Sequence, residues 1–274
     1  MSVAYGVGIG VWFSSELRIK DPATFLIPPI ILGLAAPVGV YALDHPAMPK
    51  GLPAATAAGM FLGAAEGTGI VAYQFVTSTK QNEWGFRGLS RATALGATLG
   101  GVAGYTLGYF QEPAPESSVL LTSTALWGTA IGAMYGFGVS PASQSWNRAN
   151  DAAGLGGLIG FNAGAAAGAV LSLVMVPSGE QLGWMWAGGG IGAAASLPIF
   201  LFYAGKDTPP AKRGFIFMAT ATTVGILAGG IFGSGSADYS ISATDRGPGR
   251  FKLSYVVPKL DSRTFGVELG GELF

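Results

Sequence analysis

The sequence contains no cysteine and a single histidine, His45. Without cysteine the chain can form no disulfide, no thiolate metal site and no cysteine nucleophile. His45 lies between Asp44 and Pro46 in an expected turn, and there is no second histidine to complete a metal site with it. We therefore expect no metal and no cofactor.

Charge is also scarce. Only 11% of the residues are charged, against roughly 25% in an average soluble domain. Half of the residues are hydrophobic, and the mean hydropathy is +0.46. Fifteen basic and fifteen acidic residues cancel, so no overall field attracts nucleic acid. So few charges could hardly cover a soluble surface, and the composition predicts an integral membrane protein in contact with a lipid bilayer.

Eight apolar stretches follow one another along the chain. They cover about residues 3–15, 24–43, 53–76, 90–110, 119–139, 152–176, 183–204 and 214–233. Apart from the first, each approaches or exceeds the ~20 residues that a helix needs to cross a bilayer. The first stretch alternates as a strand would, while Gly6 and Gly10 also fit a helical pattern. We favour a helix there and leave a strand open.

Glycine recurs at every fourth position in five of these stretches. Because four residues are slightly more than one helical turn, each series lays a groove along one helix face, where another backbone can approach closely. The pattern predicts helices packed through glycine zippers. The helix-packing glycines are Gly59, Gly63, Gly67, Gly96, Gly100, Gly104, Gly108, Gly128, Gly132, Gly136, Gly156, Gly160, Gly164, Gly168, Gly225, Gly229 and Gly233.

The stretches resemble one another when they are taken in pairs. Gly33, Gly100, Gly160 and Gly225 hold similar places in the second member of each pair, spaced by 67, 60 and 65 residues. We expect an all-α membrane domain over residues 1–233, with about eight transmembrane helices in four hairpin repeats at about 1–50, 51–116, 117–180 and 181–233. Shared Ala and Gly bias without common descent is the alternative explanation of the likeness.

The remaining segment, 234–274, has a different pattern. Residues 251–257 and 264–274 alternate partially, and Pro258 to Ser262 lie between them. This predicts a short β-hairpin in an extramembrane tail. A β-barrel for the whole chain is disfavoured, because the stretch from Ala152 to Val176 runs for 25 residues without alternation.

Basic residues gather in the turns expected inside the hairpins. The loops between hairpins hold Lys50 alone, together with several acidic residues. Short loops rich in Lys and Arg stay in the cytoplasm, so we expect a bacterial inner-membrane protein with both termini on the non-cytoplasmic side; an outer membrane stays open. The nine turn residues are Arg18, Lys20, Lys80, Arg87, Arg91, Arg148, Lys206, Lys212 and Arg213.

Aromatic residues cluster near the ends of the expected spans. Trp84, Trp146, Trp184 and Trp186 lie there, where indole rings prefer the membrane interface. We interpret them as belt residues rather than as a cofactor site.

Glu66, near the middle of the third stretch, is the best candidate for function. An uncompensated carboxylate at that depth would cost several kcal/mol or be held protonated. Its expected partners are Asn162 or Gln74, or the hydroxyls of Thr68, Thr93 and Thr98. A purely structural bond between helices is the alternative role.

The second stretch contains three prolines, Pro28, Pro29 and Pro37. They predict either a discontinuous helix of the kind that forms transporter sites or a simple packing kink.

No catalytic motif accompanies these features, and we do not expect an enzyme. The leading hypothesis is a structural or assembly subunit, whose unused glycine faces bind other membrane subunits or a second copy. The rival is a channel or transporter that carries a proton, an ion or a small solute past Glu66. An integral membrane enzyme ranks third among the hypotheses. It ranks below the other two because no cluster of His or Asp accompanies the helices.

Overall fold

The computed structural model describes residues 1–43, 48–49, 51–140, 146–204, 211–236, 251–261 and 264–273. His45, Lys50, Lys206 and the end of the tail lie outside these residues. The described chain is mainly helical. Its elements are α1 (Ser2–Glu16), α2 (Pro22–Leu43), α3 (Leu52–Thr77), α4 (Gly85–Gln111), α5 (Pro115–Val139), α6 (Trp146–Val174), α7 (Gly179–Ala195), α8 (Leu197–Ala204), η1 (Ala211–Arg213), α9 (Gly214–Phe232), η2 (Gly233–Ser236), β1 (Phe251–Asp261) and β2 (Thr264–Leu273).

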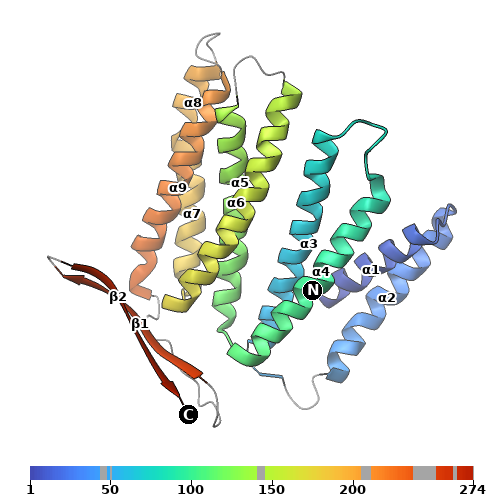
Figure 1. Cartoon of the computed structure of the whole chain (residues 1–274), viewed down its shortest axis with the longest axis horizontal. Helices are drawn as coiled ribbons and strands as arrows, with labels where there is room; N and C mark the ends of the chain where they lie inside the picture. Colours follow the sequence, from blue (N-terminus) through green and yellow to red (C-terminus); the bar gives the residue numbers. More distant parts are fainter. Residues whose placement is uncertain are drawn as a thin grey trace.

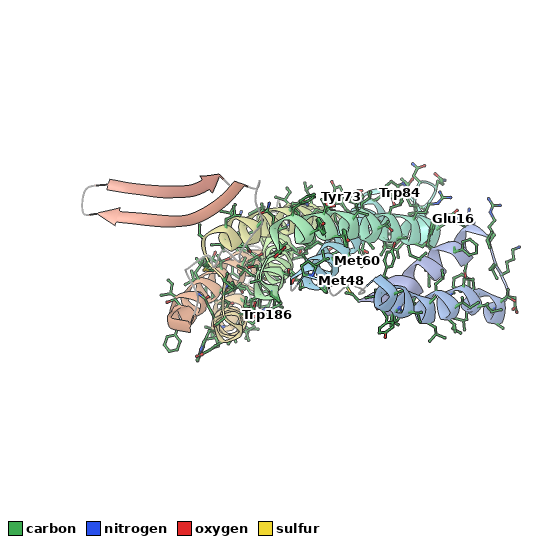
Figure 2. The ribbon with its side chains drawn as sticks, turned by 90° about the horizontal axis from the view of Figure 1, so that it is seen from below. Glu16, Met48, Met60, Tyr73, Trp84 and Trp186 are labelled. Carbon is green, nitrogen blue, oxygen red and sulfur yellow. The ribbon has the colours of Figure 1, made fainter. Side chains whose placement is uncertain are left out.

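The helices pair as consecutive antiparallel hairpins. Contacts are most extensive between α1 and α2, α3 and α4, α5 and α6, and α7 and α9. Figure 1 shows the four hairpins side by side, from α1 and α2 at the right to α7 and α9 at the left. Viewed from below, the hairpins follow one another along an elongated molecule (Figure 2). The described helices therefore form a row of four hairpins.

Four helical segments are long and apolar enough to cross a membrane by length and composition. They are Pro22–Ala42, Asn150–Val174, Gly179–Tyr203 and Gly214–Gly235. This is fewer than the seven or eight spans that the stretches suggest. Helices α3 and α4 are long enough but rich in Gly, Ala and Thr, which lowers their hydropathy. At 15 residues, α1 measures only about 22 Å, less than the hydrocarbon core of a bilayer.

The first apolar stretch is helical, so the strand is ruled out there. The second stretch is one helix, α2, so of the two alternatives that its prolines left open, the discontinuous helix is wrong. Pro29 has no N–H to donate to the carbonyl of Phe25. The hydroxyl of Ser14 donates to that carbonyl at 2.8 Å instead. A neighbouring helix thus satisfies the group that proline leaves free, as membrane helices require.

The seventh stretch, by contrast, is divided. Helix α7 ends at Ala195, and α8 begins at Leu197. Pro198 cannot donate to the carbonyl of Ala194, which explains an interruption at this point.

The glycine series lie where the two helices of a hairpin meet. A Cβ built at Gly59 would overlap the carbonyl oxygen of Gly100, and one built at Gly132 would overlap that of Gly156. The same relation holds between Gly188 and Gly225. Each of the 17 helix-packing glycines has a neighbouring helix within 4 Å of such a Cβ. Only a residue without a side chain permits this approach of two backbones.

Strands β1 and β2 pair antiparallel, with Phe251 opposite Leu273 and Asp261 opposite Thr264. Strand β1 continues beyond Val257 through Pro258, which the sequence assigns to the turn. Both strands of a two-stranded ribbon have a free edge, so a proline is tolerated there.

Candidate functional site

Glu66 and Asn162 meet where the second hairpin contacts the third. Glu66 lies near the middle of α3, and Asn162 lies on α6. The Asn162 Nδ2 atom is 3.1 Å from each carboxylate oxygen of Glu66. It is also 3.0 Å from the carbonyl oxygen of Leu158, one turn earlier in α6. Of the partners expected for Glu66, the structure selects Asn162.

Gln74 does not join this pair. Its Nε2 donates to the carbonyl of Asn82 at 2.7 Å, and its Oε1 accepts from the backbone N–H of Trp84 at 3.2 Å. Eight residues beyond Glu66, it lies about 12 Å further along the helix. Gln74 therefore holds the α3–α4 turn, and the expectation that it could bind Glu66 is wrong.

The three threonines also bond elsewhere. Thr68 and Thr93 share a hydrogen bond of 3.0 Å between α3 and α4. Thr98 is 2.9 Å from the hydroxyl of Tyr5 on α1. Their hydroxyls join helices to one another and leave Asn162 as the donor to the carboxylate.

The Glu66–Asn162 pair is accessible from outside the protein, because Glu66 is half-buried and Asn162 is exposed. In the part of the chain that the structure describes, no three His, Cys, Asp or Glu residues are grouped to hold a metal ion. Chemically, the pair offers a carboxyl group that can gain or lose a proton and an amide that can donate to it.

Two apolar cavities lie elsewhere, between neighbouring hairpins. One, of about 370 Å³, is lined by α1, α3 and α4, including Tyr5, Met60 and Thr93. The other, of about 430 Å³, is lined by α5, α6, α7 and α9, including Trp127 and Trp186. Neither Glu66 nor Asn162 lines them. The cavities and the polar pair are separate features.

The contacts of Trp186 differ from those expected of a belt residue at the membrane interface. Its Nε1 donates to the hydroxyl of Ser123 at 3.1 Å, and its ring centroid is 5.0 Å from that of Trp127. Both contacts join the fourth hairpin to the third (Figure 2 labels Trp186). The position of Trp186 near the end of an expected span suggested a contact with lipid headgroups. In the structure its contacts are with Ser123 and Trp127 of the neighbouring hairpin.

An ion pair that the sequence did not suggest joins the first two hairpins. Arg91 on α4 binds Glu16 at the end of α1 through Nε, and its Nη2 donates to the second carboxylate oxygen at 2.7 Å. This hydrogen bond from Arg91 lowers the pKa of the Glu16 carboxyl below its usual value of 4.5. The two residues are 75 positions apart, so no local pattern connects them.

Comparisons with known proteins supply no relative. No family model, no curated protein and no solved structure matches this chain.

Proposed function

We propose that this protein is a multi-pass membrane protein that serves as a structural or assembly subunit. Its seven or eight spans would be arranged as four glycine-packed hairpins. The observation that carries the proposal is the surface of the row. Large apolar side chains are exposed along it, among them Leu34 (71%), Leu99 (69%) and Ile231 (74%). A monomer in water rarely exposes apolar patches of that extent, whereas lipid or a partner would cover them.

The glycine contacts support a packing role. Two membrane helices gain little from apolar side chains alone, because lipid is equally apolar, so close backbone approach supplies the association. Hairpins 2, 3 and 4 each place glycine against the backbone of the partner helix. Stable hairpins that dock sideways suit a scaffold for assembly.

Orientation is part of the proposal. Arg18 and Lys20 lie in the α1–α2 turn, and Lys80 lies in the α3–α4 turn. Figure 1 shows the α3–α4 turn at the upper edge and the α4–α5 connection at the opposite edge. The positive-inside rule would then put the turns in the cytoplasm and the α4–α5 connection, with the β-hairpin tail, on the other side.

Transport by Glu66 is the second candidate, and the exposure of Asn162 favours it, since a proton could reach the pair. Against it, the pair lines neither cavity. Its position between α3 and α6 suits a bond that fastens two hairpins.

The deciding experiment combines particle mass with flux. Protein extracted in mild detergent should form a particle larger than one 27.8 kDa chain with its micelle. In liposomes it should conduct no protons at any pH. The assembly role would be overturned in favour of transport by two results together: a particle of one chain, and a proton flux that disappears in Glu66→Gln. Asn162→Gln is the matched amide control for the flux measurement.

A further inference from the structure

The hairpins dock on one another by one repeated rule. The first helix of each hairpin contacts the second helix of the next: α1 with α4, α3 with α6, and α5 with α9. Each junction carries a hydrogen bond between side chains. These bonds are Tyr5–Thr98 at 2.9 Å, Glu66–Asn162 at 3.1 Å and Tyr135–Thr220 at 2.8 Å.

In two of the three junctions, the residue on the first helix holds the same place in the repeat. Glu66 lies seven residues after Gly59, and Tyr135 lies seven residues after Gly128. Gly59 and Gly128 are equivalent, because each faces the backbone of the second helix in its own hairpin. The same position of the first helix is thus used twice to bind the following hairpin.

Large side chains enter glycine positions at two of these junctions. A Cβ at Gly69 of α3 would lie 2.9 Å from Leu158 of α6, and one at Gly138 of α5 would lie 2.6 Å from Ile216 of α9. Gly69 and Gly138 both fall ten residues after the equivalent glycines. A small residue in the first helix therefore receives a branched side chain from the next hairpin.

Applied to the fourth hairpin, the rule points to a face that none of the described hairpins covers. Gly188 is equivalent to Gly59 and Gly128, so the docking positions are Ala195 and Pro198. Both are exposed, as are Ala187, Ile191 and Ala194 on the same side of α7. In this part of α7, Gly190 also has nothing within 4 Å of a built Cβ. The face is shallow and apolar.

At the opposite end of the row, α2 makes its extensive contacts with α1 among the described elements. Helix α2 is the second helix of the first hairpin, and its exposed side carries Ile27 (51%), Ile31 (58%), Leu34 (71%) and Val38 (66%). These residues follow a spacing of four, three and four, which places them on one face. Like Leu158 and Ile216, they present branched side chains.

Resting on the membrane assembly role given above, we propose that the free face of α7 and α8 docks on the free face of α2 in a second copy of this chain. The row of hairpins then continues head to tail from one copy to the next. The contact joins two different surfaces, so copies form a closed ring or an open filament according to the rotation between them. Continuity with the three internal junctions, rather than apolarity alone, selects a second copy as the occupant.

Cysteine cross-linking tests the contact directly, because the natural chain has no cysteine. By the repeat, Ala195 corresponds to Glu66. The carbonyl of Leu32 faces Gly6 as the carbonyl of Gly160 faces Gly128, so Leu34, two residues after Leu32, corresponds to Asn162, two residues after Gly160. The variant Leu34→Cys/Ala195→Cys, oxidised in native membranes, should give a ladder at multiples of 27.8 kDa. Ile31→Cys/Ala195→Cys tests the neighbouring register. Each single variant should give no band beyond a dimer.

The matched control is Val102→Cys/Ile159→Cys, whose native side chains are each 61% exposed but lie on α4 and α6. A ladder from either junction pair and not from the control supports the contact. No ladder, or one as strong in the control, overturns it, as does a cross-link only to a different protein. If the cross-link fails but the wild-type particle is still larger than one chain, the assembly role stands without this contact. If the wild-type particle is a single chain, both the contact and the assembly role are overturned.

Discussion

Asn162 and Glu66 are joined across the centre of the row, with one amide nitrogen 3.1 Å from both carboxylate oxygens. The two residues are 96 positions apart and belong to different hairpins. A carboxyl group within apolar surroundings is costly unless it is paired or protonated. The pair therefore joins α3 to α6 through hydrogen bonds between side chains.

Replacing Glu66 by leucine should weaken this junction, because Asn162 loses its partner. Loss of such a bond typically costs ~1 to 3 kcal/mol. Glu66→Gln should retain most of the stability, since glutamine keeps the size and a carbonyl acceptor. Thermal unfolding in detergent measures both, and equal melting temperatures for Leu and wild type would show that the pair contributes nothing to the fold.

Gly132→Ala should destabilise the third hairpin. The added Cβ would overlap the carbonyl oxygen of Gly156, and overpacking of this kind costs ~1 to 3 kcal/mol. The matched control is Gly8→Ala in α1, where a Cβ meets nothing within 4 Å. It should be neutral or stabilising, because alanine is preferred to glycine in a helix by ~0.5 to 1 kcal/mol.

Gly51, although it lies in a connection, is no suitable control. A Cβ there would overlap the carbonyl oxygen of Pro113. If Gly132→Ala and Gly8→Ala unfold at the same temperature, the close approach of α5 and α6 is not needed for stability.

Labelling in intact cells checks the orientation. Thr79→Cys, in the α3–α4 turn, should resist an impermeant maleimide, and Glu116→Cys, at the start of α5, should react with it. Both native side chains are exposed, so accessibility on the molecule itself is matched. Ser117, one residue later, is only 6% exposed and would be protected by packing alone. Reaction at Thr79→Cys and protection at Glu116→Cys would invert the proposed topology.

Acid should loosen the first hairpin from the second. Arg91 depresses the pKa of Glu16 in the folded protein. The pair therefore stabilises the junction above the ordinary pKa of 4.5, and this contribution disappears as the pH falls through the lower, folded value. Stability measured from pH 7 down to about pH 3 should decline less steeply in Glu16→Gln than in wild type. If the stability of wild type and that of Glu16→Gln decline in parallel with pH, the Glu16–Arg91 pair makes no pH-dependent contribution.

The sequence by itself determined the class of the protein and the pairing inside hairpins. Scarcity of charge and long apolar stretches indicate helices in a membrane, and four such segments satisfy that test. The glycine spacing predicted which faces of α3 and α4, or of α5 and α6, meet. These features are local, since helical periodicity and neighbouring position in the chain suffice to bring the faces together.

Only the tertiary structure decided how hairpins stand beside one another. Three contacts join different hairpins. They are the hydrogen bond of Glu66 with Asn162 rather than with Gln74, the Glu16–Arg91 ion pair and the contact of Trp186 with Trp127. Such junctions use single side chains without a period, and apolar faces suit lipid as well as another helix. Sequence patterns therefore assigned each hairpin, whereas the order of the row required the positions of residues far apart in the chain.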